Sequence, residues 1–179
     1  GCGPIGLMSI AVLKVLGASK IFATAGGLNK VRMELAKKMG ADMVISAQEG
    51  ADIVKIIREA SDGNGVDVAL EMSGNPTAVR QAFEMLTPGG RVSLLGILDK
   101  PMEIDLNNAV IFKSATVYGI HGRRMFQTWY QMKGMLRNPE FRNKIAAIIT
   151  HKIPFREVAK GVGLIRSKQA GKVVLQPKW

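Results

Sequence analysis

The 179-residue sequence contains one cysteine, two histidines and few aromatic residues. A single cysteine, Cys2, excludes an internal disulfide, and one cysteine with two distant histidines does not form a zinc-ligand set. No apolar run approaches the roughly 20 residues that a membrane-spanning helix requires, and no secretory signal is visible. We therefore expect a globular, cytoplasmic protein that is not inserted in a membrane.

Acidic residues are also scarce. The 25 lysines and arginines exceed the 14 acidic residues and give a formal net charge of +11, a balance that raises the possibility of nucleic-acid binding. The densest basic segments, Arg123–Arg124 and 137–144, contain a single aromatic residue, Phe141, and lack the interleaved aromatic side chains on which successive bases could stack. Elsewhere the basic residues are dispersed along helices. We therefore expect solvated basic faces and no nucleic-acid partner.

Glycine is plentiful, and residues 1–6 form a G-x-G-x-x-G loop that leads directly into the amphipathic stretch 7–16. In a dinucleotide-binding fold, such glycines allow a tight turn, close approach of the backbone to a pyrophosphate, and close packing of helix on strand. Pro4 and Ile5 contribute backbone and shape to the turn. Cys2 is interpreted as a small residue tolerated beside phosphate, not as a nucleophile.

Hydrophobic periodicity predicts alternating helices and strands. The predicted helices are 5–16, 30–39, 51–60, 77–86, 126–136 and 155–167, with a further helix ending at 110–113. The predicted strands are 21–24, 43–45, 66–71, 91–95, 116–120 and 172–175. This alternation is typical of a doubly wound parallel sheet of the Rossmann type. The strand that should precede the glycine loop is absent and the first residue is not Met, so we expect part of a longer enzyme.

The regular alternation of predicted helices and strands changes near Phe141. We predict a dinucleotide-binding domain over residues 1–141, truncated at its start, and a segment over 142–179 that returns to a catalytic domain outside the chain.

Several segments resemble the coenzyme-binding half of zinc-dependent medium-chain dehydrogenases, and within that family the L-threonine 3-dehydrogenases. The general resemblance lies in residues 1–7, 34–42, 62–67, 71–76, 87–92 and 171–175. The segments more specific to the threonine enzymes are 71–74, 110–113, 117–120, 122–123, 126 and 128–129.

The resemblance implies NAD-dependent oxidation of L-threonine to 2-amino-3-ketobutyrate, with zinc polarising the alcohol oxygen. It places the zinc ligands in a preceding domain, so we expect the chain alone to be inactive and to contain no catalytic or metal-binding residue. It also implies a role in threonine catabolism and a homo-oligomer, a tetramer by resemblance, assembled partly through an edge segment at 101–106.

The resemblance further implies a set of cofactor-binding residues. In chain order these are Gly1, Gly3, Pro4, Ile5, Gly6, Arg32, Met72, Ser73, Leu95, Gly96, Ile97, Ile120 and His121. Arg32 would reach the adenosine ribose, or would be a solvated helix charge. The strand ends at 95–97 would approach the nicotinamide ribose, and Ile120 with His121 would complete the nicotinamide wall. Packing roles for Leu95 and Ile120, and a structural role for His121, are the alternatives; His151 is expected to be structural.

One position departs from the pattern. NAD selectivity in this fold uses an acidic residue at the end of the second strand, and we place Ala25 there, followed by the loop 26–29. Without the carboxylate, Lys30 and Arg32 could pair with the 2′-phosphate of NADP. NAD is favoured, NADP stays open, and an Asp at Ala25 would be expected to tighten NAD binding.

Two other functions remain open on the sequence. The chain could be the coenzyme domain of a related polyol or alcohol dehydrogenase, or a non-catalytic dinucleotide-binding module. A free-standing module would lack a central strand and expose unpaired backbone groups, at a cost comparable with the roughly 5–15 kcal/mol stability of a domain. The enzyme hypothesis is therefore favoured.

Overall fold

The structure is a computed structural model that describes residues 1–27, 29–48 and 50–177, so Leu28 of the loop 26–29 lies outside the described residues. The chain divides into two compact units. Gly1 and Gly50–Gly122 form one, here called the middle unit; Cys2–Glu49 and Arg123–Trp179 form the other, here called the two-segment unit. Each unit is described by itself.

The two-segment unit contains two pairs of parallel strands. Its first segment consists of α1 (Pro4–Val15), β1 (Phe22–Gly26), α2 (Lys30–Met39) and β2 (Met43–Ala47). Its second segment consists of α5 (Gln127–Met135), α6 (Pro139–Ala147), β6 (Ile149–Pro154), the 3₁₀ turn η2 (Phe155–Glu157), α7 (Val158–Arg166) and β7 (Lys172–Gln176). β1 pairs with β2, and β6 pairs with β7. A helix connects the strands of each pair, as parallel pairing requires.

The middle unit is built on a three-stranded parallel sheet. It contains α3 (Ile53–Glu59), β3 (Val66–Glu71), α4 (Pro76–Glu84), β4 (Leu86–Leu94), the π-helix η1 (Asn107–Ile111) and β5 (Thr116–Gly119). The strand order is β3-β4-β5. Asn75 caps α4 by accepting from the amides of Thr77 and Ala78, and Pro76 occupies the first turn, where a missing N–H costs nothing.

These parallel sheets confirm the predicted α/β class. In their separate sheets, β1 and β3 are each terminal strands, with a partner on one side only. None of the described helices is long and apolar enough to cross a membrane.

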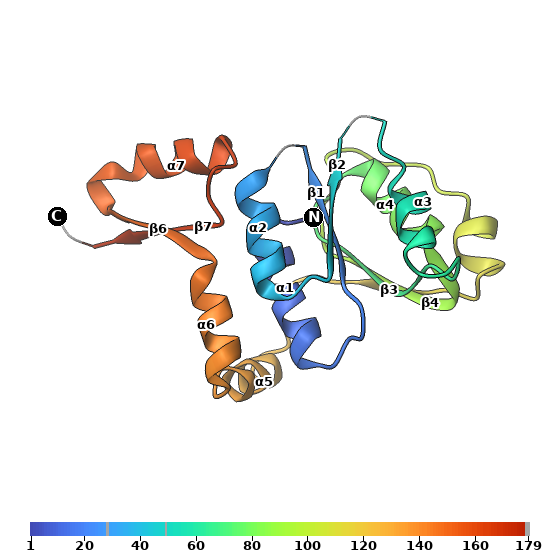
Figure 1. The fold of residues 1–179 in the computed structure, drawn as a ribbon, viewed down its shortest axis with the longest axis horizontal. Coiled ribbons are helices and arrows are strands. Elements are labelled where there is room, and N and C mark those ends of the chain that lie inside the picture. Colours follow the sequence, from blue (N-terminus) through green and yellow to red (C-terminus); the bar gives the residue numbers. More distant parts are fainter. Residues whose placement is uncertain (28, 49, 178–179) are drawn as a thin grey trace. The chain divides into compact units, whose positions relative to one another are not determined.

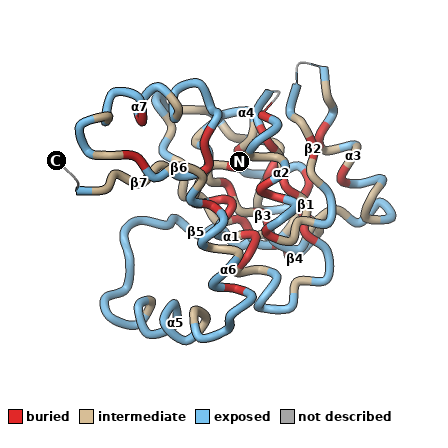
Figure 2. The backbone as a smooth tube through the Cα atoms, turned by 60° about the vertical axis from the view of Figure 1, so that its left-hand side comes forward, coloured by how far each residue is buried: buried red, intermediate tan, exposed pale blue. Residues whose placement is uncertain are grey.

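Each unit has its own apolar core. In the two-segment unit, α1 turns Leu7, Ile10 and Ala11 inward at helical spacing, and they pack with Met39 of α2 and Phe141 of α6. In the middle unit the buried residues are Ala69, Val79, Ala82, Phe83, Leu86 and Val92. Figure 2 shows the buried residues concentrated on α1, α2 and β1, while α5 is largely exposed.

Several predicted details differ in the structure. β6 and α6 were not predicted, and the segment 101–105 is irregular where an edge strand was considered. β4 begins at Leu86, ahead of the predicted start, because residues 86–90 continue the strand across a register shift. The predicted domain boundary near Phe141 falls within α6, whose Phe141 side chain is buried in the core of the two-segment unit; that boundary remains a prediction.

Candidate functional site

The glycine loop forms the start of α1. Gly3 is the N-cap residue with φ −70° and ψ 175°, Pro4 follows in the first turn, and the Leu7 amide donates to the Gly3 carbonyl at 2.9 Å. No side chain caps this end of the helix, and no acidic residue lies in its first turn. The amides of the first turn and the positive end of the helix dipole therefore suit an anion.

The three glycines of the loop lie in different surroundings. A methyl group at Gly3 would meet no atom within 4 Å, so the protein itself leaves room there. Gly6 is buried and faces the core. Gly1 belongs to the middle unit, where a methyl group on it would approach Cβ of Ser73 to 3.0 Å. Gly1 thus lies beside the end of β3.

Cys2 does not have the properties of a nucleophile. Its side chain is buried, and its thiol donates to the Thr24 carbonyl at 3.4 Å. Burial raises the pKa of the thiol. This environment is consistent with the interpretation that Cys2 is a small residue of the loop and not a nucleophile.

The end of β3 is organised around a buried carboxylate. The Glu71 side chain is 3% exposed, and it accepts from the Ser73 amide at 2.8 Å, from the Gly74 amide at 3.0 Å and from the Ser73 hydroxyl. The Ser73 hydroxyl also accepts from the Asn75 amide at 3.1 Å. The hydroxyl of Ser73, a predicted cofactor-binding residue, is therefore engaged within the protein, and Met72 beside it is half-buried.

The end of β4 packs directly on this turn. The amides of Leu95 and Gly96 both donate to the Glu71 carbonyl, at 2.9 and 3.2 Å. A methyl group at Gly96 would overlap the Gly74 nitrogen and lie 2.6 Å from Oε2 of Glu71. Ile97 follows and is largely exposed. The glycines are thus required for the close approach of the two strand ends.

The end of β5 completes this edge of the middle sheet. The Ile120 amide donates to the Leu94 carbonyl at 2.9 Å, and both Ile120 and His121 are exposed. The structure therefore gathers Gly1, Met72, Ser73, Leu95, Gly96, Ile97, Ile120 and His121 at or just beyond the carboxyl ends of three parallel strands of one unit. This is the edge at which open parallel sheets bind ligands.

Arg32 lies in the two-segment unit with the helix start of α1. Its backbone amide donates to the capping Asn29 side chain at 3.3 Å, and its Nε donates to the Ala170 carbonyl at 3.1 Å. One guanidinium nitrogen therefore ties α2 to the segment that precedes β7. A contact of Arg32 with a ribose remains a prediction.

The expectation for Ala25 needs correction. Its side chain is 2% exposed and belongs to the core that contains Ala23 and Leu7, so it faces the interior. The exposed positions at the end of β1 are Gly26 and Gly27, and the Ser46 hydroxyl donates to the Gly27 carbonyl at 3.1 Å. Gly26 and Gly27, and not Ala25, are therefore the exposed positions at this strand end, and neither has a side chain.

Comparison with known proteins identifies the family. The profile of a family described as zinc-binding dehydrogenase matches residues 4–138, which is most of the chain. The chain belongs to this family.

Two curated relatives of this zinc-binding dehydrogenase are L-threonine 3-dehydrogenases. The protein from Caldanaerobacter subterraneus subsp. tengcongensis is 48% identical over 177 residues, with 99% of this chain and 50% of the relative covered. The protein from Bacillus subtilis strain 168 is 44% identical with the same coverage. The chain therefore spans about half the length of these relatives. The resemblance to medium-chain dehydrogenases, and to the threonine enzymes among them, is confirmed.

Solved structures agree with the fold. An alcohol dehydrogenase from Thermotoga maritima matches with a TM-score of 0.85 and 30% identity, over 99% of this chain and 48% of that one. A 2R,3R-butanediol dehydrogenase from Bacillus subtilis matches with a TM-score of 0.80 and 34% identity, over 99% and 49% of the two chains.

The described residues of the chain do not fit a zinc ion. No group of three or more His, Cys, Asp or Glu side chains within the described part of the chain could hold a metal. His121 and His151 belong to different units, and Nδ1 of His151 lies 2.9 Å from the Thr150 hydroxyl. No zinc chemistry is therefore assigned to residues of this chain.

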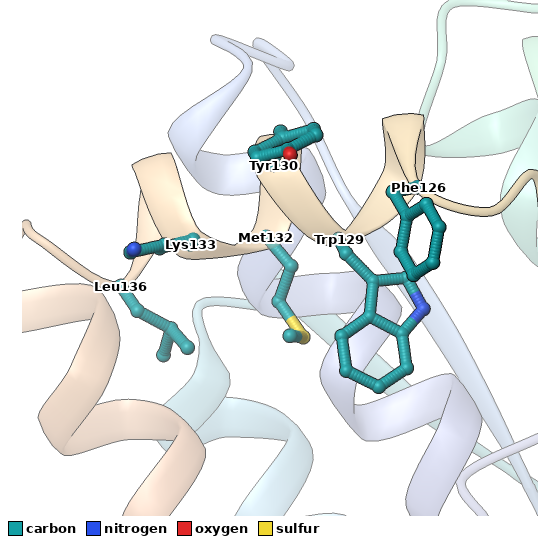
Figure 3. Close-up of a pocket in the computed structure, with 6 residues that line it drawn as sticks. All are labelled: Phe126, Trp129, Tyr130, Met132, Lys133 and Leu136. Carbon is teal, nitrogen blue, oxygen red and sulfur yellow. The ribbon is translucent and has the colours of Figure 1, made fainter.

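An apolar groove on α5 was not anticipated from the sequence. It is lined by Phe126, Trp129, Tyr130, Met132, Lys133 and Leu136. Figure 3 shows Trp129, Met132 and Leu136 pointing to the same side of the helix, as their i, i+3, i+7 spacing dictates. The Arg123 guanidinium lies 6.0 Å from the Trp129 ring centroid, a cation–π geometry. The spacing was visible in the sequence, but periodicity does not distinguish a face covered by the same fold from one left open.

Proposed function

We propose that this chain is the coenzyme-binding part of an NAD-dependent, zinc-type dehydrogenase that oxidises L-threonine to 2-amino-3-ketobutyrate. The C3 hydrogen of threonine leaves as a hydride to the nicotinamide, and the hydroxyl proton passes to solvent, so that NADH and a proton accompany the ketone. Zinc, when bound by the rest of the enzyme, would polarise the alcohol oxygen. The chain by itself is proposed to be inactive.

One observation carries the coenzyme assignment: the start of α1 at Gly3 has no side-chain cap, no acidic residue in its first turn, and open space beside Gly3. A pyrophosphate would accept hydrogen bonds from the first-turn amides and neutralise the end of the helix dipole. The strand ends of the middle unit offer backbone groups and apolar side chains, which suit a flat nicotinamide ring better than a second anion.

The substrate proposal rests on sequence similarity. The two relatives that are 44% and 48% identical over 99% of this chain are named L-threonine 3-dehydrogenase. Similarity to a butanediol dehydrogenase and an alcohol dehydrogenase favours, as the second candidate, a related polyol or alcohol dehydrogenase. A non-catalytic dinucleotide-binding module is the third candidate.

The α5 groove supports the proposal that further protein belongs to this enzyme. Trp129 and Tyr130 are 48% and 73% exposed, which is costly for large apolar side chains on a free surface. Since the relatives are about twice as long as this chain, we assign the groove to contact with the remaining half of the same enzyme.

NAD is the proposed coenzyme, by family resemblance. The described positions 26, 27 and 29 provide no carboxylate to repel a 2′-phosphate, so NADP use is a real alternative. Because Gly26 is exposed, has open space beside it and lies outside the left-handed region, Gly26→Asp tests selectivity directly. NADP affinity should fall relative to NAD, while a Ser46→Ala control, which removes a neighbouring hydroxyl but adds no charge, should leave the ratio unchanged.

The decisive experiment uses the full-length protein. Formation of NADH or NADPH would be followed with L-threonine, butane-2,3-diol and sorbitol as alternative substrates, each with NAD and with NADP. The proposal requires the highest kcat/KM with L-threonine and NAD. Preference for a diol or polyol would move the assignment to the second candidate, and coenzyme binding without turnover of any alcohol would favour the binding module.

Localisation, oligomeric state, pathway and partners are also proposals. We propose a cytoplasmic homo-oligomer, a tetramer, that acts in threonine catabolism, with a small-molecule substrate and no nucleic-acid or membrane partner. Light scattering of the full-length protein would measure the oligomeric state.

A further inference from the structure

The carboxylate of Glu71 has no assigned role in the proposed chemistry, yet it is buried at the end of β3. A buried carboxylate is retained at low cost only when hydrogen bonds replace its hydration. Glu71 obtains them from the turn that follows it: the amides of Ser73 and Gly74 and the hydroxyl of Ser73.

The same residue also fixes the end of the neighbouring strand. The Glu71 carbonyl accepts from the amides of Leu95 and Gly96, so its backbone holds the end of β4 while its side chain holds the turn after β3. Gly74 adopts φ +70°, and a methyl group on it would overlap the Ile97 carbonyl oxygen. These contacts leave almost no freedom between the Ser73–Gly74 turn and the Gly96–Ile97 backbone.

We propose that Glu71 is a positioning residue, which fixes the Ser73–Gly74 turn and the Gly96 backbone into the surface that receives the nicotinamide half of the dinucleotide. The inference rests on the proposed coenzyme function. Glu71 touches no coenzyme itself; it acts through Ser73, Gly74 and Gly96. All of these residues belong to the middle unit, whereas Gly3 and Arg32, assigned to the pyrophosphate and adenosine, belong to the other unit.

Glu71→Gln is the informative change because it preserves size and removes one acceptor. If the amide oxygen takes the place of Oε1, its NH₂ group faces the Gly74 amide; if the amide is reversed, it faces the Ser73 amide. In either orientation one backbone N–H loses its acceptor, and the turn must shift to recover one. Because Gly96 packs on Gly74, that shift reaches the end of β4.

The test compares two ligands on the full-length protein. NADH contains the nicotinamide and its ribose, whereas ADP contains only the adenosine and the diphosphate. We expect Glu71→Gln to raise the Kd for NADH about tenfold, the equivalent of one hydrogen bond to a charged group. The Kd for ADP should stay within about twofold. A role in overall folding alone would weaken both ligands in parallel.

Asn75→Ala supplies a matched control at the same corner of the middle unit. It removes the cap of α4, which should lower thermal stability, but leaves the acceptor atoms of Glu71 untouched. Its Kd for NADH should equal that of the wild type. If Glu71→Gln does not fold, Ser73→Ala removes a single donor to Glu71 and should give a smaller, two- to threefold loss of NADH affinity, again with the Kd for ADP unchanged.

The outcomes separate this inference from the proposed function. If the wild type binds NADH and a folded Glu71→Gln binds it equally well, or loses NADH and ADP affinity in parallel, the positioning role is wrong and the coenzyme assignment stands. If the wild type binds neither ligand, the proposed function fails, and the positioning role fails with it.

Discussion

Gly3→Ala tests folding stability and coenzyme binding separately. The backbone of Gly3, at φ −70° and ψ 175°, lies in the extended region open to alanine, and the added methyl group would meet no protein atom within 4 Å. The folded state should therefore accept the change. Alanine is a poorer N-cap than glycine but reduces the freedom of the unfolded chain, and these opposing effects should leave the stability within about 1 kcal/mol of the wild type.

Coenzyme binding should respond very differently. The methyl group would occupy the open space next to the first-turn amides, where the pyrophosphate is proposed to lie. Loss of one charge-assisted hydrogen bond is worth about 1.5–3 kcal/mol, so the Kd for NADH should rise roughly 10- to 100-fold. NADH fluorescence titration and thermal unfolding of the full-length protein would measure the two effects separately.

Gly163→Ala is the matched control for that experiment. Gly163 lies within α7 of the same unit, and a methyl group there also meets nothing within 4 Å. Because alanine favours a helix interior, this variant should gain up to about 1 kcal/mol and bind NADH normally. A Gly3→Ala protein that is folded and binds NADH as tightly as this control would refute the placement of the pyrophosphate.

Three further changes test other parts of the structure. Lys113→Met should lower the free energy of unfolding in urea by about 2 kcal/mol, because the Lys113 ammonium group donates to three main-chain carbonyls around the end of α4. The control Lys55→Met removes an exposed ion pair and should lower it by about 0.5 kcal/mol or less. Equal losses in the two variants would contradict a stabilising role for the Lys113 hydrogen bonds. Asp42→Asn should remove stability at neutral pH but not in acid: the Ile21 amide holds the pKa of Asp42 below its ordinary value, so the contribution is present above the ordinary pKa and disappears as pH falls through the lowered one. If the wild type stayed more stable than Asp42→Asn in strong acid, the assignment of this stability to the ionised Asp42 carboxylate would be wrong. Ala25→Asp should lower the melting temperature without tightening NAD binding, because the new carboxylate would be buried in the core; tighter binding would restore position 25 to the ribose.

Local signals predicted much of the fold. The helix predicted over 77–86 begins in the structure at Pro76, because the Asn75 side chain caps α4 and a proline without an N–H fits the first helical turn. The same pair recurs at Asn138–Pro139 and begins α6, so the domain boundary predicted near Phe141 falls inside a helix. The unpredicted β6 pairs with β7, more than 20 residues later, and such a partner is not visible in a local window.

The candidate site was predictable in outline and not in detail. Glycine spacing indicated the turn before α1, but the inward direction of Ala25 depends on where β1 ends, and strand ends are the least certain part of a pattern. The hydrogen bonds of Glu71 could not be predicted from the sequence either, because they form only when the turn at Ser73 and Gly74 folds back on the strand.

The terminal positions of β1 and β3 in their sheets constrain how proteins of this kind can be recombined. A gene fusion joined at the glycine loop would carry two strands whose outer edges have no partner in their own sheets, and such edges recruit other strands, including those of neighbouring molecules. Chimeras that exchange coenzyme specificity between dehydrogenases should therefore be joined upstream of a whole strand, and solubility of the chimera would report whether the junction was well chosen.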